Sequence, residues 1–191
     1  MYRCSRFWFV FYFNKKWNSF ERPRLNISAG ITTRQFNGRN PIARINNTIY
    51  SLTQKENYLK IYEKTYARIG YSQEATNGIY VSGSLEYANR KPLFNTTNYV
   101  MFGRDIPFQS NNPLDPTDFT ASFDEHRIWT MNLGASIVFG QKYLMYPNSK
   151  FGIGNTKYPS LYVGYRKTFG AKNSEYNSDL FIARLRQFLS L

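Results

Sequence analysis

The sequence predicts an all-β fold, an antiparallel up-and-down sheet of about six strands that forms part of a transmembrane β-barrel with long loops on one rim. Three observations lead to this prediction. Apolar and polar residues alternate in several segments, which is the period of a strand. Stretches rich in Asn, Pro and Asp separate several of these segments. The 191 residues include 16 Tyr, 16 Phe and 3 Trp although mean hydropathy is -0.53, as expected when apolar side chains gather on one face of each strand.

Six segments show the alternation, and all but the last have one apolar and one polar face. In the last segment both faces are apolar apart from three polar residues, so its orientation stays open. The polar faces of the others consist of Gly, Ser, Thr and Asn with charges of both signs, which suits a narrow water-filled barrel interior. The six segments are residues 25–31, 66–74, 79–88, 127–139, 161–169 and 180–189.

The clearest strand, residues 127–139, has an aromatic residue at each end of its apolar face. Trp129 and Phe139 are ten residues apart, which corresponds to roughly 25 Å along a membrane normal at about 3.3 Å per residue and a tilt of about 40°. This matches the height of an outer-membrane apolar band. Trp129, Phe139 and Tyr87 are therefore predicted to belong to aromatic girdles. A core strand of a soluble β-sandwich would show the same alternation.

The turn at Asn77-Gly78 predicts a strand register. A two-residue type I′ turn would bring charged residues onto the apolar face of the neighbouring strand, whereas a three-residue loop with Gly78 in the left-handed region keeps both faces coherent. In that register Gly70 lies opposite Ser84, and Arg68 lies opposite Glu86. We therefore predict that Arg68 and Glu86 form a cross-strand pair facing the barrel interior.

The other connections are much longer than this turn. Residues 35–62 and 90–126 are predicted to be long loops, and residues 47–54 a short helix within the first of them. The 140–157 connection is expected to fold inward or to extend its flanking strands. Long loops on one rim with short turns on the other are typical of bacterial outer-membrane barrels.

Residues 1–23 stay unassigned, while residues 24–191 are taken as the partial barrel. Residues 7–13 form an apolar run that follows a short basic stretch, but no small-x-small cleavage site follows them. Three interpretations stay open for the segment: the non-native start of a broken reading frame, an additional barrel strand, or a signal sequence.

Composition excludes several kinds of chemistry. One Cys and one His leave no disulfide framework or structural zinc site, and no catalytic constellation is visible, so the chain is predicted not to be an enzyme and to need no metal or cofactor. A loop with Asp115, Asp118, Asp124 and Glu125 lacks the spacing of an EF-hand, and His126 beside it is interpreted as a rim residue. The charge of +13 is not clustered as in a nucleic-acid-binding arm, so no nucleic-acid partner is expected.

Several short motifs in order resemble a family of bacterial outer-membrane β-barrels of unknown function (DUF5686-like). The resemblance covers about residues 24–190 and implies a barrel fold in the bacterial outer membrane, usually preceded by a carboxypeptidase-regulatory-like domain. It implies no catalytic or ligand-binding residues. The motifs are Asn40-Pro41-Ile42, residues 47–52, residues 56–64, residues 77–81, residues 85–88, Arg90-Lys91-Pro92-Leu93 and residues 157–161.

The favoured function is that of a non-enzymatic fragment of an outer-membrane barrel, serving transport, surface binding or envelope assembly. Its expected partners are outer-membrane lipid, lipopolysaccharide phosphates contacted by Arg90, Lys91 and Arg104, and the missing barrel strands of a parent protein interrupted by a split, truncation or frameshift. About six strands are fewer than the eight of the smallest single-chain barrels. The alternative is a soluble basic β-protein that binds nucleic acid or glycan through aromatic residues.

Overall fold

The computed structural model describes residues 10–16, 21–38, 41–95, 99–101, 107–153, 158–171 and 174–187. These residues fall into two compact units. The first unit lies within residues 1–10, 30–65 and 89–126, and the second within residues 11–29, 66–88 and 127–191.

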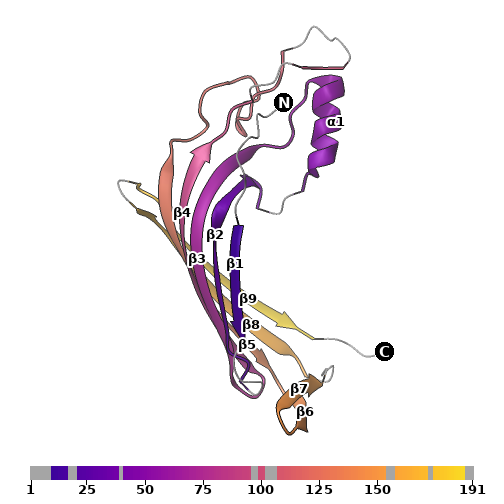
Figure 1. Cartoon of the computed structure of the whole chain (residues 1–191), viewed down its shortest axis with the longest axis vertical. Helices are drawn as coiled ribbons and strands as arrows, with labels where there is room; N and C mark the ends of the chain where they lie inside the picture. Colours follow the sequence, from indigo (N-terminus) through magenta and orange to yellow (C-terminus); the bar gives the residue numbers. More distant parts are fainter. Residues whose placement is uncertain are drawn as a thin grey trace. The chain divides into compact units, whose positions relative to one another are not determined.

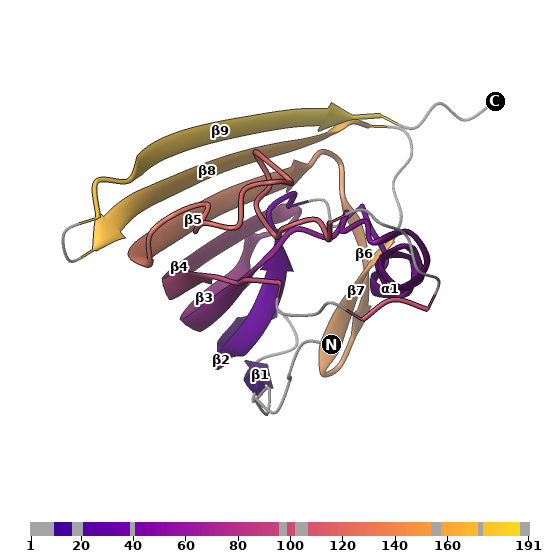
Figure 2. The ribbon, with the colours of Figure 1, turned by 90° about the horizontal axis from the view of Figure 1, so that it is seen from above.

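Seven strands form one sheet, in the order β1-β2-β3-β4-β5-β8-β9 (Figures 1 and 2). All six predicted strands are present, and residues 10–16 of the unassigned N-terminal segment add a seventh. Neighbours in the sheet are neighbours in the chain except at β5 and β8, as in an up-and-down arrangement. In this order β1 and β9 are the outer strands, and no pairing between them is found among the described residues. The bounds are β1 (Val10–Lys16), β2 (Arg24–Gln35), β3 (Ile61–Thr76), β4 (Ile79–Pro92), β5 (His126–Val138), β8 (Ser160–Ala171) and β9 (Asn177–Arg186).

The strand registers settle the orientation of β9, which the sequence left open. Strand β5 pairs antiparallel with β8, so that Leu133 lies opposite Tyr165. Strand β8 in turn pairs with β9, and Tyr165 lies opposite Phe181 with the two ring centroids 4.6 Å apart. Phe181 and its alternate neighbours therefore continue the apolar face of β5 and β8.

The turn between β3 and β4 has the predicted backbone. Gly78 has φ 79° whereas Asn77 does not have a positive φ, which excludes a type I′ turn because that turn needs positive φ at both central residues. A Cβ added to Gly70 would lie 3.4 Å from the Cβ of Ser84. This proximity agrees with the register in which Gly70 and Ser84 face each other.

The connection between β5 and β8 differs from the expectation. Extension of its flanking strands is wrong, since β5 ends at Val138 and the connection forms its own two-stranded sheet (Figure 1). This hairpin consists of β6 (Lys142–Tyr146) and β7 (Ser149–Ile153), joined through Pro147 and Asn148. Pro lacks an N–H donor and Pro-Asn favours a turn, so the chain reverses here instead of continuing a ladder.

The predicted short helix is confirmed and is longer at its N-terminus. Helix α1 spans Arg44–Gln54, and the chain leaves it through Lys55 with φ 59°. No helix in the described part of the chain is long and apolar enough to cross a membrane.

Candidate functional site: two opposite sheet faces

The strands of the second unit expose a row of apolar side chains on one side of the sheet, here called the apolar face. Their exposure is substantial, 48% for Leu133 and 76% for Phe181. The registers of β5, β8 and β9 place the members of these strands on the same side, and alternation with the polar residues described below places those of β2, β3 and β4 there. The members are Ile27, Ile69, Tyr71, Leu85, Leu133, Val163, Phe169, Phe181 and Leu185.

The buried apolar core is small by comparison. Among the described residues only Leu59, Ala88 and Ile128 are buried apolar side chains. A soluble domain of this size normally encloses a much larger core, because burial of apolar surface is the main favourable contribution to folding. Most apolar side chains of this sheet are therefore exposed rather than packed in a core.

The opposite side of the sheet, here called the polar face, is joined across four strands by hydrogen bonds between side chains. Arg68 Nη2 donates to Ser84 Oγ at 3.1 Å, and Asn132 Nδ2 donates to the same oxygen at 3.3 Å. Arg166 Nε donates to Asn132 Oδ1 at 2.7 Å. The chain of contacts runs from β3 through β4 and β5 to β8 and ends in an arginine at each side.

Glycines bring the backbone close to side chains on this polar face. A Cβ on Gly134 would lie 3.0 Å from Ser82 Oγ and 3.1 Å from the Tyr162 hydroxyl. A Cβ on Gly164 would lie 2.8 Å from the same hydroxyl. The tyrosine ring therefore occupies space that the two glycines leave open.

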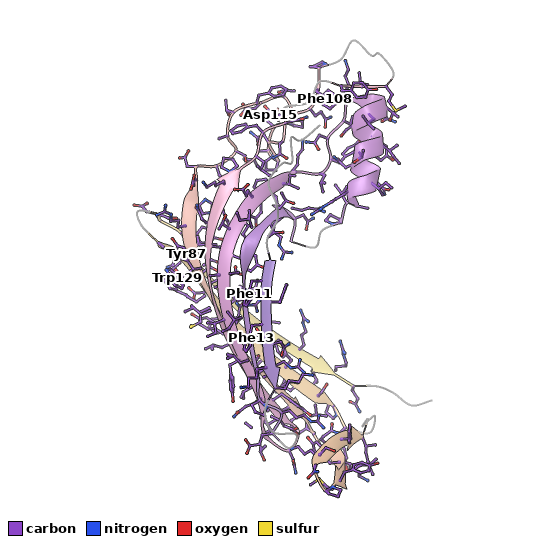
Figure 3. The ribbon with its side chains drawn as sticks, in the orientation of Figure 1. Phe11, Phe13, Tyr87, Phe108, Asp115 and Trp129 are labelled. Carbon is purple, nitrogen blue, oxygen red and sulfur yellow. The ribbon has the colours of Figure 1, made fainter. Side chains whose placement is uncertain are left out.

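Two of the predicted girdle residues, Trp129 and Phe139, lie at opposite ends of β5, and Tyr87 lies on β4. Tyr87 and Trp129 are in contact, with ring centroids 4.9 Å apart at 53° (Figure 3). Trp129 also lies opposite Phe169 of β8. Phe139 follows directly after β5, is 43% exposed and donates its N–H to Pro159 O at 3.4 Å. Membership of a membrane girdle stays a prediction for all three predicted residues.

The predicted pair of Arg68 and Glu86 also stays a prediction. The contact described for the Arg68 side chain is Ser84, which neighbours the position opposite Arg68 in the predicted register. The hydrogen bond is compatible with that register because diagonal neighbours on one face lie within reach of a long side chain.

Sequence reasoning missed a charged group on the apolar face. Lys167 Nζ lies 2.7 Å from Asp179 Oδ2, and the Tyr165 hydroxyl donates to Asp179 Oδ1 at 2.6 Å. Alternation already places Lys167 among the apolar residues of its segment, so the signal was present, but its partner depends on the β8–β9 register.

A second missed group joins the β3–β4 turn to the β6–β7 hairpin. The Glu74 side chain is fully buried, and its Oε2 lies 3.3 Å from Lys150 Nζ, its only partner in the described structure. Glu74 Oε1 accepts hydrogen bonds from the Tyr143 hydroxyl and, at 3.1 Å, from Gly78 N. Burial, together with the hydrogen bond to Glu74, raises the pKa of Tyr143. Lys150 also donates to Asn77 Oδ1 at 2.9 Å, so the hairpin and the turn share one polar cluster.

In the first unit, buried asparagines hold the two long connections together. Asn111 Nδ2 donates to the carbonyls of Ile61 and Leu93, each at 2.6 Å, while its Oδ1 accepts from Ile61 N at 2.9 Å. Asn47 of α1 donates to Asn57 Oδ1 at 3.1 Å. Lys60 Nζ donates to Ser110 O at 2.5 Å, and burial lowers the pKa of Lys60.

A small cavity of about 130 Å³ lies beside this asparagine cluster. Its wall includes Phe94, Phe119 and Asn112, and no charged residue. The amide of Asn112 is engaged by Asp118 Oδ2 and by Leu114 N. The cavity therefore presents few free polar groups to a ligand.

The acidic loop that contains Asp115, Asp118, Asp124 and Glu125 is organised by local turns. The Asp115 and Asp118 carboxylates accept hydrogen bonds from Thr117 and Thr120, which lower the pKa of each acid. His126 Nδ1 lies 3.0 Å from Asp124 O. Within the described ranges, no three His, Cys, Asp or Glu side chains gather as a metal site would require.

The three basic residues expected to contact lipopolysaccharide have different surroundings from one another. Arg90 lies over the ring of Tyr62, 5.5 Å from its centroid, and its Nε is buried without a hydrogen bond. Lys91 Nζ lies 3.4 Å from Glu125 Oε1, and both side chains are nearly half exposed. Arg104 lies outside the described residues.

Comparison with known proteins identifies a family. The C-terminal domain of a family of unknown function (DUF5686) matches residues 2–191. This range includes residues 2–23, so leaving them outside the family resemblance was wrong. No curated protein and no solved structure matches the chain. Nearly the whole sequence fits one family model, and the chain therefore belongs to the DUF5686 family through its C-terminal domain.

Proposed function

We propose that this chain forms part of the wall of a β-barrel in the bacterial outer membrane, with the apolar face toward lipid and the polar face toward water. The observation that carries the proposal is the exposed apolar face on β2–β5, β8 and β9, backed by a face of hydrogen-bonded Ser, Asn and Arg. Outer-membrane strands alternate in this way, apolar outward and polar inward.

An apolar face that spans six strands is expected to be shielded from water by another molecule. Soluble monomers rarely expose contiguous apolar patches larger than a few hundred Å². The contacting Tyr87 and Trp129 rings at the start of β5 fit the aromatic girdle that bounds an apolar band. Lipid supplies the cover without requiring a complementary protein surface.

The edge strands β1 and β9 call for further strands in the same wall. An unpaired strand edge cannot remain in a bilayer, because its N–H and C=O groups find no hydrogen-bond partners in hydrocarbon. The partners we propose are therefore additional barrel strands, outer-membrane lipid and lipopolysaccharide. The role we propose for the assembly is non-enzymatic, in transport, surface binding or envelope assembly.

Lipid quenching at single cysteines tests the orientation of the sheet. The full protein carrying Cys4→Ser receives one cysteine at Leu133 or at its neighbour Asn132, is labelled with an environment-sensitive fluorophore and is reconstituted in vesicles containing brominated lipid. We expect strong quenching at position 133 and weak quenching at position 132, because the two side chains point to opposite faces.

A second pair, Leu85 and Ser84 on β4, serves as an independent repeat. Equal quenching within both pairs would contradict the proposal. Release of the unlabelled protein from cell envelopes by high salt without detergent would instead support the soluble basic alternative.

A further inference from the structure

We propose that the polar face carries a binding site for an oxyanion, a ligand with phosphate or carboxylate groups, between Arg68 and Arg166. The residues of the site lie on β3, β4, β5 and β8, in the parts of these strands that belong to the second unit. The inference goes beyond the proposed membrane role and needs only the polar face, whatever covers the apolar one.

The two guanidinium groups are joined through neutral side chains. Arg68 binds Ser84, Arg166 binds Asn132, and Asn132 binds Ser84, with hydrogen-bond distances of 3.1, 2.7 and 3.3 Å. No carboxylate takes part in this chain of contacts. Ser84 and Asn132 are neutral, so these hydrogen bonds do not neutralise the two guanidinium groups, and the contact described for Arg68 is with Ser84 rather than with its predicted partner Glu86.

In the contacts described, each arginine has further N–H donors with which to bind a ligand. A guanidinium has five N–H donors in a planar fork, and the contacts described use one nitrogen of Arg68 and one of Arg166. Fork geometry matches phosphate and carboxylate oxygens, which arginine binds in a bidentate manner. The hydrogen bonds to Ser84 and Asn132 fix the side chains in advance, which reduces the entropy lost on binding.

The surrounding charges favour an anion as well. On the polar face of β2–β5, β8 and β9 within the second unit, the five basic residues are all arginines, and two acidic residues accompany them. One of the two, Glu74, is buried against Lys150 and so contributes little net negative charge to the face. The positions follow from strand alternation and from the β8–β9 register, in which Arg184 lies opposite Tyr162. The set comprises Arg24, Arg68, Arg166, Arg184, Arg186, Glu74 and Glu86.

The apolar face supplies a contrast within the same strands. On β2–β5, β8 and β9 within the second unit, its charged residues are Arg127 and the ion pair of Lys167 with Asp179. Arginine is therefore concentrated on the side where Ser and Asn also gather. A face of this composition attracts anions over several Å and is less attractive to cations.

Charged thiol reagents measure this potential directly. The full protein with Cys4→Ser and Ser82→Cys places an exposed thiol on the polar face, two residues before Ser84 on the same strand. Two methanethiosulfonate reagents are used, one with an anionic sulfonate group and one with a cationic trimethylammonium group. The rates at which they react with this thiol are compared with their rates at Leu114→Cys, an 86% exposed loop position in the first unit. We expect the anionic-to-cationic rate ratio at position 82 to exceed that at position 114 by about threefold or more at low salt.

Inorganic pyrophosphate then tests for a site rather than a diffuse potential. We expect it to slow the anionic reagent at position 82 more than sodium chloride of equal ionic strength does. Arg68→Gln and Arg166→Gln should abolish this protection, while Arg166→Lys should keep the rate ratio and weaken the protection, because lysine retains the charge without the fork. Arg127→Gln on the apolar face is the matched control and should change neither measurement.

The outcomes separate the site from its alternatives. An unchanged rate ratio at position 82, or protection by pyrophosphate no greater than that by matched chloride, would overturn the proposal. Tryptophan fluorescence of each variant verifies that the sheet is intact. The lipid-quenching result at positions 132 and 133 is independent of these rates, so failure of the membrane proposal and failure of the anion site are distinguishable.

Discussion

Glu74 and Lys150 are the most deeply buried ion pair among the described residues, with side-chain exposures of 0% and 9%. A buried pair is costly to desolvate, yet removal of one partner is costlier because it leaves an uncompensated charge. The carboxylate also accepts from Gly78 N and the Tyr143 hydroxyl. The pair therefore fixes the β6–β7 hairpin to the β3–β4 turn more through its geometry than through net electrostatic gain.

We expect Glu74→Gln to lower the free energy of unfolding by about 3 kcal/mol, since Lys150 loses its counterion in a buried site. Urea unfolding followed by tryptophan fluorescence measures the change. The exposed pair of Lys91 and Glu125 provides the matched control, and Glu125→Gln should cost less than about 1 kcal/mol. Adding Lys150→Met to Glu74→Gln should recover part of the loss, and equal effects of the two glutamine variants would refute the role of the buried pair.

At the scale of elements, the β3–β4 hairpin depends on one backbone conformation. Gly78 has φ 79°, and a Cβ there would approach Val138 O to 2.6 Å. Val138 N donates to Gly78 O at 2.8 Å, so the turn is also tied to the end of β5. Local turn chemistry and the contact with the neighbouring strand require glycine at the same position.

Gly78→Ala should destabilise the protein by about 2 kcal/mol, because alanine is strained in the left-handed region and its Cβ meets a backbone oxygen. Gly38→Ala is the control, as a Cβ at Gly38 has nothing within 4 Å and its φ is not positive. It should be neutral or stabilising by up to about 1 kcal/mol. Thermal unfolding measures the change in stability of each variant. Equal changes in the two variants would show that strain in the turn is unimportant.

In the long connections, side-chain amides form the hydrogen bonds to buried backbone groups that neighbouring strands would form in a sheet. Asn111 bonds both the N–H and the C=O of Ile61 and reaches Leu93 O at the end of β4. It thereby satisfies buried backbone groups that water does not reach.

Asn111→Asp should weaken this packing by about 2 kcal/mol, since the carboxylate keeps the acceptor but loses both donors and faces two carbonyl oxygens. Limited proteolysis of residues 107–120 measures the effect as faster cleavage. Asn46→Asp is the matched control, because it makes the same substitution at an exposed position of α1. It should leave the cleavage rate unaltered. Equal cleavage of the two variants would show that Asn111 does not hold the loop.

At the scale of the whole molecule, the apolar face determines whether the protein is more stable in a lipid bilayer or in water. If lipid covers it, Leu133→Arg should cost about 2–4 kcal/mol in vesicles, as a charge facing the bilayer core does. Leu114→Arg makes the same exchange at a more exposed loop position and should be nearly neutral. Urea titration of the reconstituted variants tests this prediction, and it fails if arginine is tolerated equally well at both positions.

Much of the sheet was predictable because alternation is a local signal. The strands containing Trp129 and Leu161 were placed by period alone, and the Gly78 turn was predicted from its chemistry. The β6–β7 hairpin was missed because its two strands are five residues each and lack alternation. The pairing of Lys167 with Asp179 was missed because it depends on which residues of β9 face β8, which a segment apolar on both faces does not reveal.

The sequence by itself determined an all-β chain with one apolar and one polar face, because strand geometry turns a period of two into sidedness without reference to distant residues. Only the tertiary structure decided the order of the strands, the orientation of β9, the burial of Glu74 against Lys150 and the linkage of Arg68 to Arg166 through Ser84 and Asn132. These features join residues far apart in the chain. Their partners are set by register and packing, which local composition does not encode.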